Sequence, residues 1–358
     1  MGKRDYSMLG PDALRAVETG LAAAEWYHSE VPRKEMKALM QRSDQPALRD
    51  TLILFTVMVL TAAGGTWLWS SLWSAPFWLI YGVLYGSAMD SRWHECSHGT
   101  AFKTPWMNDV LYQIASFCMV RNPVTWRWSH ARHHTDTIIV GRDPEIAIMR
   151  PPVFLKLIAN FFGIFDAING WGRMLYNAFV GVHPEEASWI PQSEQPKVVR
   201  VARVWVAIYA ATLAAAIWSG SLLPLMLIGL PRLYGAWHHV MTGLLQHGGL
   251  ADNVTDHRLN SRTVYMNPVS RFIYWNMNYH VEHHMFPMVP YHRLPDLHAR
   301  IRDDLPAPCP SIAAGFAEMW PALRRQLANE DYFLRRALPP TARPYREEFH
   351  AAALGAAE

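Results

Sequence analysis

The sequence predicts an all-α integral membrane protein, with about four transmembrane helices in two hairpins and a cytoplasmic helical cap rich in histidine. Three observations support this fold class. Residues 51–89 contain no charged residue and no histidine, and residues 204–231 form a second uncharged stretch. The 17 histidines lie outside both stretches, and many of them fall into short clusters. The mean hydropathy of −0.03 therefore averages over strongly apolar and strongly polar segments.

The first uncharged stretch is long enough for two membrane-spanning helices, because one span needs about 20 apolar residues. We expect a hairpin that turns near residues 70–74, with several tryptophans at the membrane interface. Residues 1–50 are rich in lysine and arginine and are expected to form an amphipathic cytoplasmic segment. By the positive-inside rule, both termini and the histidine cap face the cytoplasm, most simply at a bacterial inner membrane.

Residues 204–231 and the apolar run that resumes after Arg232 predict the second hairpin, with its turn at Gly220. A charge inside an apolar run usually faces a cavity or a partner, so Arg232 is a candidate contact for a polar substrate group. Alternatively, the span is shifted and Arg232 only snorkels towards water. Two further apolar runs, residues 105–120 and 153–171, contain polar residues and are expected to lie along the interface.

The predicted organisation is therefore an N-terminal segment (1–50), a membrane catalytic domain (51–300) and a cytoplasmic C-terminal tail (301–358). The chain has 33 basic and 30 acidic residues, a formal charge of +3, which excludes a strongly basic nucleic-acid-binding protein. Its three cysteines lie far apart in sequence, which argues against a disulfide framework or a four-cysteine cluster.

Histidine spacing is the strongest functional signal. Offsets of three and four residues share one face of a helix, so each cluster can direct its ring nitrogens to one point. Neutral imidazoles around a cation are mutually satisfied, whereas protonated ones would repel each other. Eight ligands are too many for one tetrahedral zinc ion. The three clusters contain His94 and His98; His130, His133 and His134; and His280, His283 and His284.

The clusters HECSH, HARHH and HVEHH resemble the three histidine boxes of the membrane fatty acid desaturase and hydroxylase superfamily. The resemblance covers about residues 51–298. It implies two iron ions held almost wholly by histidine, dioxygen as co-substrate, and one more ligand after the fourth span, which matches His247. The implied ligands are His94, His98, His130, His133, His134, His247, His280, His283 and His284, and weaker candidates are His238, His239, His257, His292 and His298.

This resemblance implies an oxidoreductase that attacks unactivated C–H bonds, with fatty acyl desaturation or hydroxylation as the first expectation. The runs WHECSHGTAFK and WRWSHARHHTDTIIVGRDPE also resemble bacterial oxygenases of rhizopine catabolism, which implies a hydroxylase or O-demethylase of a small polar molecule as the alternative. An acyl substrate predicts a long apolar tunnel towards the bilayer. A small polar substrate predicts a short pocket open to the cytoplasm.

Electrons must come from a separate protein, because the sequence has no Gly-rich nucleotide motif, no four-cysteine cluster and no His-Pro-Gly-Gly haem motif. The expected donor is a ferredoxin, a Rieske protein or a small cytochrome, together with its reductase. Many such donors are acidic, so Arg127, Arg132 and Arg142 are candidate docking residues.

Metal-bound imidazoles usually give their second N–H to a carboxylate or a carbonyl group. Near the boxes, such supporting residues could be Asp136, Asp143, Glu145, Glu282 and Asn276. Two alternatives from other classes remain. The segment from His94 to His98 also reads as HExxH, which would make Glu95 the general base of a zinc intramembrane protease. A membrane metal transporter is the other, although residues 51–89 contain no ionisable ligand.

Overall fold

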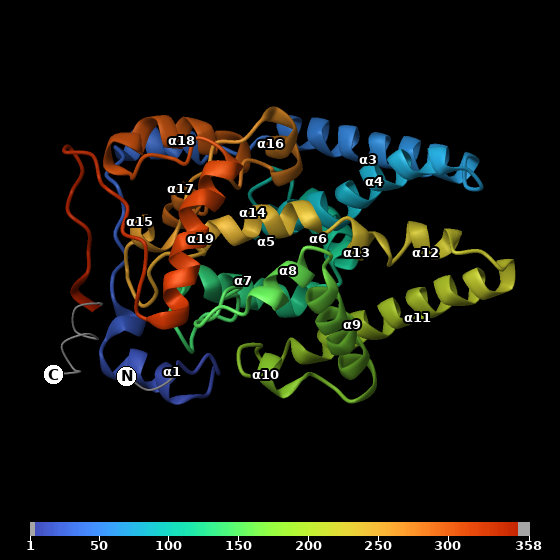
Figure 1. The fold of residues 1–358 in the computed structure, drawn as a ribbon, viewed down its shortest axis with the longest axis horizontal. Helices are drawn as coiled ribbons and strands as arrows, with labels where there is room; N and C mark the ends of the chain where they lie inside the picture. Colours follow the sequence, from blue (N-terminus) through green and yellow to red (C-terminus); the bar gives the residue numbers. More distant parts are fainter. Residues whose placement is uncertain (1–3, 350–358) are drawn as a thin grey trace.

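The computed structural model describes residues 4–349, and these residues are helical, without a regular β-strand. Two isolated β-bridges, Thr263 to Tyr279 and Val264 to Cys309, are the extended pairings among them. Two helical arms project from a body of shorter helices towards the same side (Figure 1). Helix α1 (Pro11–Glu18) and the segment 331–345 lie at the opposite end of the molecule. Residues 350–358 of the predicted tail lie outside the described part.

The first arm is a pair of helices joined by a turn at the predicted place. Helix α3 (Asp44–Trp67) leads outwards, η2 (Leu72–Ser74) makes the turn, and α4 (Ala75–Val83) returns. The return continues through a π-helical turn, η3 (Leu84–Ala88), into α5 (Met89–Ser97). In the π-helical turn, the Ser87 hydroxyl donates to the carbonyl oxygen of Gly235 at 2.5 Å. One uninterrupted helical path therefore joins the outer turn to the first histidine box.

The second arm confirms the turn at Gly220 but not a continuous fourth helix. Helix α11 (Gln195–Ser219) ends at Gly220, whose φ is 61°. The return path is broken into α12 (Leu223–Leu227), α13 (Pro231–Tyr234) and α14 (Trp237–His247). Gly229 has a φ of 99°, and the next helix begins with Pro231, which has no backbone N–H to donate. The expectation of a single fourth spanning helix was therefore wrong.

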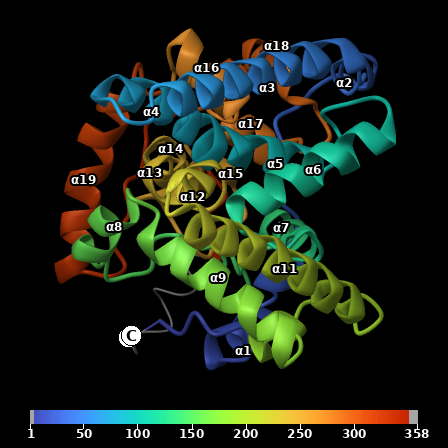
Figure 2. The same cartoon turned by 90° about the vertical axis from the view of Figure 1, so that its right-hand side faces the viewer.

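Both arms have apolar surfaces that a water-soluble fold would bury. The stretch Arg33–Trp67, which contains α3, and helix α11 are each long and apolar enough to cross a membrane, by length and composition. Only 28% and 22% of their most apolar windows are buried inside the protein. Exposed apolar area on this scale is typical of a surface that contacts lipid. In Figure 2, which looks onto the arm tips, α3 and α4 lie at the top and α11 and α12 lie below them.

The two runs expected at the membrane interface form amphipathic helices. Residues 105–120 form α6 (Pro105–Met119), which packs against α5 and exposes Trp106, Val110 and Ile114. Residues 153–171 are divided between α8 (Phe154–Asn160) and α9 (Ile164–Phe179). Helix α9 packs along α11, so it holds the second arm against the body.

The predicted terminal segments pack closely on the body. Arg4 forms an ion pair with Asp252 at 2.8 Å, and the backbone N–H of Tyr27 donates to the carbonyl of Thr255. At the other end of the chain, Leu323 is buried in one apolar cluster with residues of α14. The remaining helices of the body are η1 (Leu21–Ala23), α2 (Arg33–Leu39), α7 (Pro123–Thr135), α10 (Pro184–Ala187), α15 (His257–Asn260), α16 (Pro268–Tyr274), α17 (His280–Met285), η4 (Tyr291–Arg293), α18 (Leu294–Ile301), η5 (Arg302–Asp304) and α19 (Ile312–Ala328).

Candidate metal centre

Four helices of the body carry the histidines. The first box lies at the end of α5, the second on α7, the third on α17, and His247 is the last residue of α14. Helix α7 begins at Pro123, a favourable first helical residue, and the Asn122 side chain accepts a hydrogen bond from the Val124 N–H at 3.1 Å. This cap fixes where α7 starts and hence which of its residues face inwards.

The structure brings all nine implied ligands together in two groups. In each group, one ligand atom per residue lies within 4.8 Å of all the others. The groups adjoin each other, since the rings of His134 and His284 have centroids 4.5 Å apart. The first group is His94, His98, His130, His134 and His283, and the second group is His133, His247, His280 and His284.

The ring nitrogens point at one another within each group. The Nε2 atoms of His94 and His283 are 2.8 Å apart, and those of His247 and His280 are 3.0 Å apart. Burial first, and then the neighbouring histidines, hold the pKa of His94 well below its ordinary value. Burial also lowers the pKa values of His98, His134, His280, His283 and His284 well below the ordinary value. These rings are therefore neutral at physiological pH, which is the form that binds metal.

In two of the rings, Nδ1, the nitrogen that faces away from the group, has a hydrogen-bond partner of its own, and this arrangement suits a ring that binds a cation through Nε2. His247 Nδ1 lies 2.7 Å from the carbonyl oxygen of Asn260, which can only accept, so Nδ1 carries the hydrogen. His130 Nδ1 lies 3.0 Å from the Glu145 carboxylate and makes the same arrangement. With Nδ1 occupied by these contacts, Nε2 is the nitrogen left to bind a metal, and in both rings it faces the rest of its group. Several inward lone pairs without a shared hydrogen favour a metal ion between them.

Two of the predicted supporting carboxylates contact box histidines. Glu145 accepts from His130 and from the Ser129 hydroxyl, and Asp143 lies 2.8 Å from Nδ1 of His133. Burial alone would lower the pKa of His133, but the Asp143 carboxylate outweighs it and raises that pKa. Both carboxylates follow α7 in sequence and fold back along it, so one short segment orients two rings in different groups.

The other predicted supporting residues have different partners. Asp136 binds Arg142 at 3.0 Å, Asn276 bonds to Arg271 and to the Tyr291 carbonyl, and the Glu282 carboxylate binds His298 and Thr263. Their expected role at the box histidines was therefore wrong. Residues that are neighbours in sequence point to different faces of a helix. On α17 the side chain of Glu282 therefore leaves the helix on the side away from His283 and His284.

Two supporting groups were not predicted. The Thr137 hydroxyl lies 3.2 Å from Nδ1 of His284, and the Asn260 backbone carbonyl binds His247. Thr137 follows the second box by three residues, so its position was visible in sequence. A backbone carbonyl has no residue-type signal, and the role of Asn260 could not have been found that way.

The weaker histidine candidates lie outside both groups. His298 binds Glu282, His238 lies 3.2 Å from the Ser270 hydroxyl, and His292 is on η4. His257 is buried beside the second group, with its ring centroid 5.1 Å from that of His284. His239 is buried next to a cavity, and neither of its ring nitrogens has a hydrogen-bond partner among the described residues.

Glu95 is in the wrong place for the general base of a zinc protease. Its carboxylate accepts hydrogen bonds from the Thr100 hydroxyl at 2.7 Å and from the backbone N–H of Tyr291 at 3.0 Å. It is completely buried among these partners and belongs to neither histidine group. The HExxH pattern therefore gives two histidines on one helical face and a structural glutamate on another.

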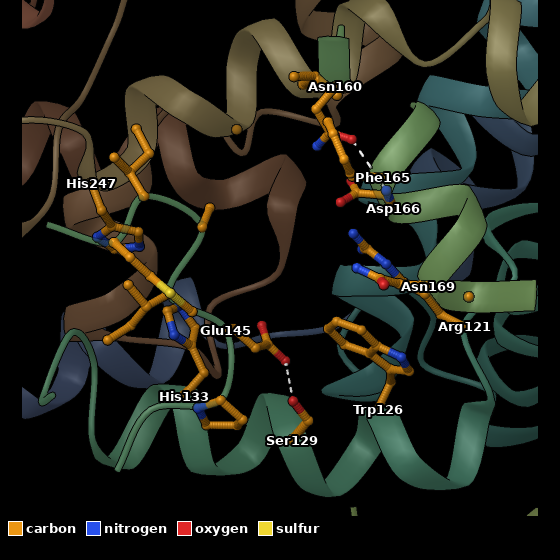
Figure 3. A pocket seen from close by; sticks show the side chains of 18 of the residues that line it. Arg121, Trp126, Ser129, His133, Glu145, Asn160, Phe165, Asp166, Asn169 and His247 are labelled. Atoms are coloured by element: carbon orange, nitrogen blue, oxygen red, sulfur yellow. Dashed lines mark hydrogen bonds between the residues drawn. The ribbon is translucent and has the colours of Figure 1, made fainter. Parts of the chain in front are cut away.

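A cavity of about 580 Å³ adjoins both groups and is lined by His94, His133 and His247. In Figure 3, His133 and His247 lie on one side, Glu145 lies between, and Arg121, Trp126, Asp166 and Asn169 lie on the other. The lining also includes apolar side chains, among them Met119, Val120, Leu157, Phe165 and Leu244. The cavity therefore has a mixed surface, with charged groups opposite the histidines.

Arg232 belongs to this cavity and does not snorkel. Its side chain is 1% exposed, its Nε donates to the Met119 carbonyl at 3.3 Å, and it lies 3.6 Å from the Asp166 carboxylate. Next to it, Arg121 forms an ion pair with Asp90 at 2.6 Å. All four residues line the cavity, and Figure 3 shows Arg121 and Asp166 on the side opposite His133 and His247.

Replacing Asp143 with asparagine is expected to lower metal affinity about 10–100-fold, because a carboxylate that orients a ligand ring also raises its basicity. Iron retained against a competing chelator measures this. Asp136→Asn is the matched control, since Asp136 binds Arg142 rather than a histidine. Equal losses in the two variants would show that Asp143 has no special relation to the metal site.

Fold and site together define a helical membrane protein whose buried histidines form two adjoining groups able to hold metal. Residues 70–315 match the sequence profile of the family described as fatty acid desaturase. Since this match covers more than half of the chain, the protein belongs to the fatty acid desaturase family.

Curated relatives are similar at low identity. The chain is 22% identical to an omega-3 fatty acid desaturase, chloroplastic, of Sesamum indicum, over 71% of this chain and 59% of that protein. It is 23% identical to an sn-2 acyl-lipid omega-3 desaturase (ferredoxin), chloroplastic, of Arabidopsis thaliana, over 69% and 58%. An acyl-lipid omega-3 desaturase (cytochrome b5), endoplasmic reticulum, of the same plant is 22% identical over 71% and 69%. The chain thus covers less than two thirds of the first two relatives.

Proposed function

We propose that this protein is a membrane-bound, dioxygen-dependent diiron oxidoreductase that acts on unactivated C–H bonds, with fatty acyl desaturation or hydroxylation as its reaction. The observation that carries this proposal is the pair of adjoining histidine groups beside a cavity. Imidazole suits iron, and two groups can hold two ions. When bound, two iron ions would activate dioxygen so that it removes hydrogen from carbon.

The chain's own residues would prepare this chemistry in three ways. Asp143 and Glu145 fix the orientation of two rings in different groups. Burial lowers the pKa of seven of the nine histidines, which favours their neutral form, and it limits the access of water to a strong oxidant. The cavity wall opposite the histidines holds the substrate carbon near the metal, since His94, His133 and His247 face the same space as Asp166 and Asn169.

We place both arms in the membrane, with the histidine groups just below the cytoplasmic surface of a bacterial inner membrane. The exposed apolar surfaces of α3 and α11 support this arrangement. So do the lysines and arginines of the N-terminal segment, which packs on the body rather than on the arms. An external electron donor of the ferredoxin, Rieske or small cytochrome class completes the system; ferredoxin and cytochrome b5 appear in the names of two relatives.

A second substrate class is favoured by the lining of the cavity. Arg121, Arg232, Asp90, Asp166 and Asn169 are more suited to a small polar molecule, such as a methylated inosamine, than to a bare alkyl chain. Charged groups facing an alkyl chain would lose hydration without gaining a partner. On this alternative the enzyme is a hydroxylase or O-demethylase, and the apolar part of the cavity holds the ring carbons.

One experiment decides between these substrates. Iron-loaded protein in liposomes is given dioxygen, a ferredoxin, its reductase, and either acyl phospholipids or a methylated inosamine, and the products are identified by mass. We expect desaturated or hydroxylated acyl chains from the first reaction. If the polar class is correct, Asp166→Leu will stop turnover of the inosamine. No product from either class, with iron bound, would overturn the proposed activity.

A further inference from the structure

An aromatic stack leads from the protein surface to the second histidine group. The ring of Trp26, which is half-buried, lies on the ring of His257 with centroids 4.3 Å apart and planes 9° from parallel. His257 is 2% exposed, and its ring centroid is 5.1 Å from that of His284 with an interplanar angle of 32°. Three π systems are therefore in contact between the edge of the protein and a candidate metal ligand.

The same tryptophan also reaches the first group through the backbone. Its Nε1 donates to the carbonyl oxygen of Thr135 at 3.1 Å, and Thr135 directly follows His134 in the second box. Trp26 thus contacts one residue next to each histidine group. It is not part of the cavity lining, so this approach to the metal site is separate from the substrate cavity.

A second tryptophan, Trp93, also contacts the histidine groups, but it does not connect them to a separate exposed face. Trp93 lies 5.4 Å from His130 by ring centroids, but it is only 2% exposed. Its neighbour Trp126, 5.4 Å away and at an angle of 83°, lines the substrate cavity. A macromolecular donor could not use that path without blocking the substrate, whereas Trp26 is partly exposed and lies outside the cavity lining.

Positive charge lies beside Trp26. Arg132 and Arg142 flank the end of α7, where Trp26 is bonded, and their side chains are 26% and 21% exposed. Both pair with one carboxylate, that of Asp136, which is itself only 2% exposed. The two guanidinium groups are partly exposed and the carboxylate between them is buried, so the charge that these three groups present at the surface is positive. Such a face attracts acidic partners and speeds their association.

We propose that electrons enter this protein at Trp26 and pass through the stacked His257 to His284, and that an acidic [2Fe–2S] ferredoxin docks on the face formed by Trp26, Arg132 and Arg142. This inference rests on the proposed diiron function. Each reduced ferredoxin loses one electron, and two such transfers reduce two ferric ions to the ferrous state. No bond forms or breaks in this transfer.

The test is the rate at which reduced plant-type ferredoxin reduces the iron-loaded protein, followed by stopped-flow absorbance without substrate. Trp26→Leu is expected to slow this reduction several-fold, and Trp26→Phe, which keeps an aromatic ring on His257, is expected to restore most of the rate. Reduction by dithionite, a small reagent that needs no docking, should be the same in all three proteins. Trp320→Leu, which removes a half-buried tryptophan stacked on Phe154, is the matched control.

Docking is tested by a second pair of variants that does not depend on the first. Arg142→Glu is expected to raise the Kd for gallium-substituted ferredoxin, which binds but cannot transfer an electron. Arg127→Glu is the control, because the docking face proposed here consists of Trp26, Arg132 and Arg142 and excludes Arg127, the third arginine that the sequence analysis named. Arg127 pairs with Asp109, and its Cα lies about 12 Å from that of Thr135 along α7, from the helical rise per residue. Equal Kd values for the two variants would overturn the docking face.

The outcomes separate this inference from the function on which it rests. Protein that binds no iron contradicts the proposed function. Iron-loaded protein that dithionite reduces but ferredoxin does not contradicts the donor assigned here. A Trp26→Leu variant that ferredoxin reduces at the wild-type rate contradicts the electron path. If that variant does not fold, the comparison of Arg142→Glu with Arg127→Glu decides the docking face.

Discussion

Changing His133 to alanine is expected to abolish product formation and to lower the bound iron by about half. His133 is one of the four members of the second group, and its Nδ1 is held by Asp143. Without it three imidazoles remain to hold that ion, and the buried Asp143 carboxylate keeps only its two backbone partners, the N–H groups of Ile138 and Glu145. The first group keeps all five members, so its metal should remain bound.

The measurements are elemental iron per chain and product by mass spectrometry. His292→Ala is the control, because His292 belongs to neither group and lies on η4 at the edge of the body. It should keep full iron and full turnover. Full iron and unchanged turnover in His133→Ala would remove this residue from the ligand set.

The second large effect is expected from Gly235→Val. A Cβ atom at Gly235 would lie 1.8 Å from the carbonyl oxygen of Gly82 and 2.7 Å from that of Pro231. At the same crossing, a Cβ at Gly86 would lie 2.4 Å from the Pro231 carbonyl. These are backbone atoms, so rotation of a side chain cannot relieve the clash. The first arm and the broken return of the second arm can therefore approach this closely only through glycine.

We expect Gly235→Val to destabilise the protein by about 3 kcal/mol and to lower the yield of folded protein. Thermal unfolding in detergent and elution on size exclusion measure this. Gly172→Ala, on α9, is the matched control, because a Cβ there meets no atom within 4 Å and alanine favours helix. A Gly235→Val variant with wild-type unfolding temperature would contradict the close helix crossing.

The length of residues 51–89 and their lack of charge were sufficient to predict the first hairpin. In an apolar medium their backbone N–H and C=O groups must form hydrogen bonds with one another, and helices satisfy this within a single segment. The turn at Gly220 was predicted for the same reason. The break in the return path was not. Gly229 and Pro231 were visible in the sequence, but apolar composition alone does not show whether a helix continues through them.

The nine histidines were predicted from spacing and resemblance, but their division into two groups was not. His133 and His134 are adjacent in sequence and belong to different groups. One residue of α-helix turns the side chain by about 100°, so adjacent histidines on α7 point into different groups. Partners distant in sequence, such as His298 for Glu282 and Arg142 for Asp136, had no local signal.

In the proposed function, histidines from four helices converge on a pair of iron ions. Metal analysis of the purified protein, combined with X-ray absorption at the iron edge, tests this arrangement. We predict about two iron atoms per chain, with nitrogen as the main ligand atom. A single tightly bound zinc ion, or protein that takes up no iron during reconstitution, would contradict it.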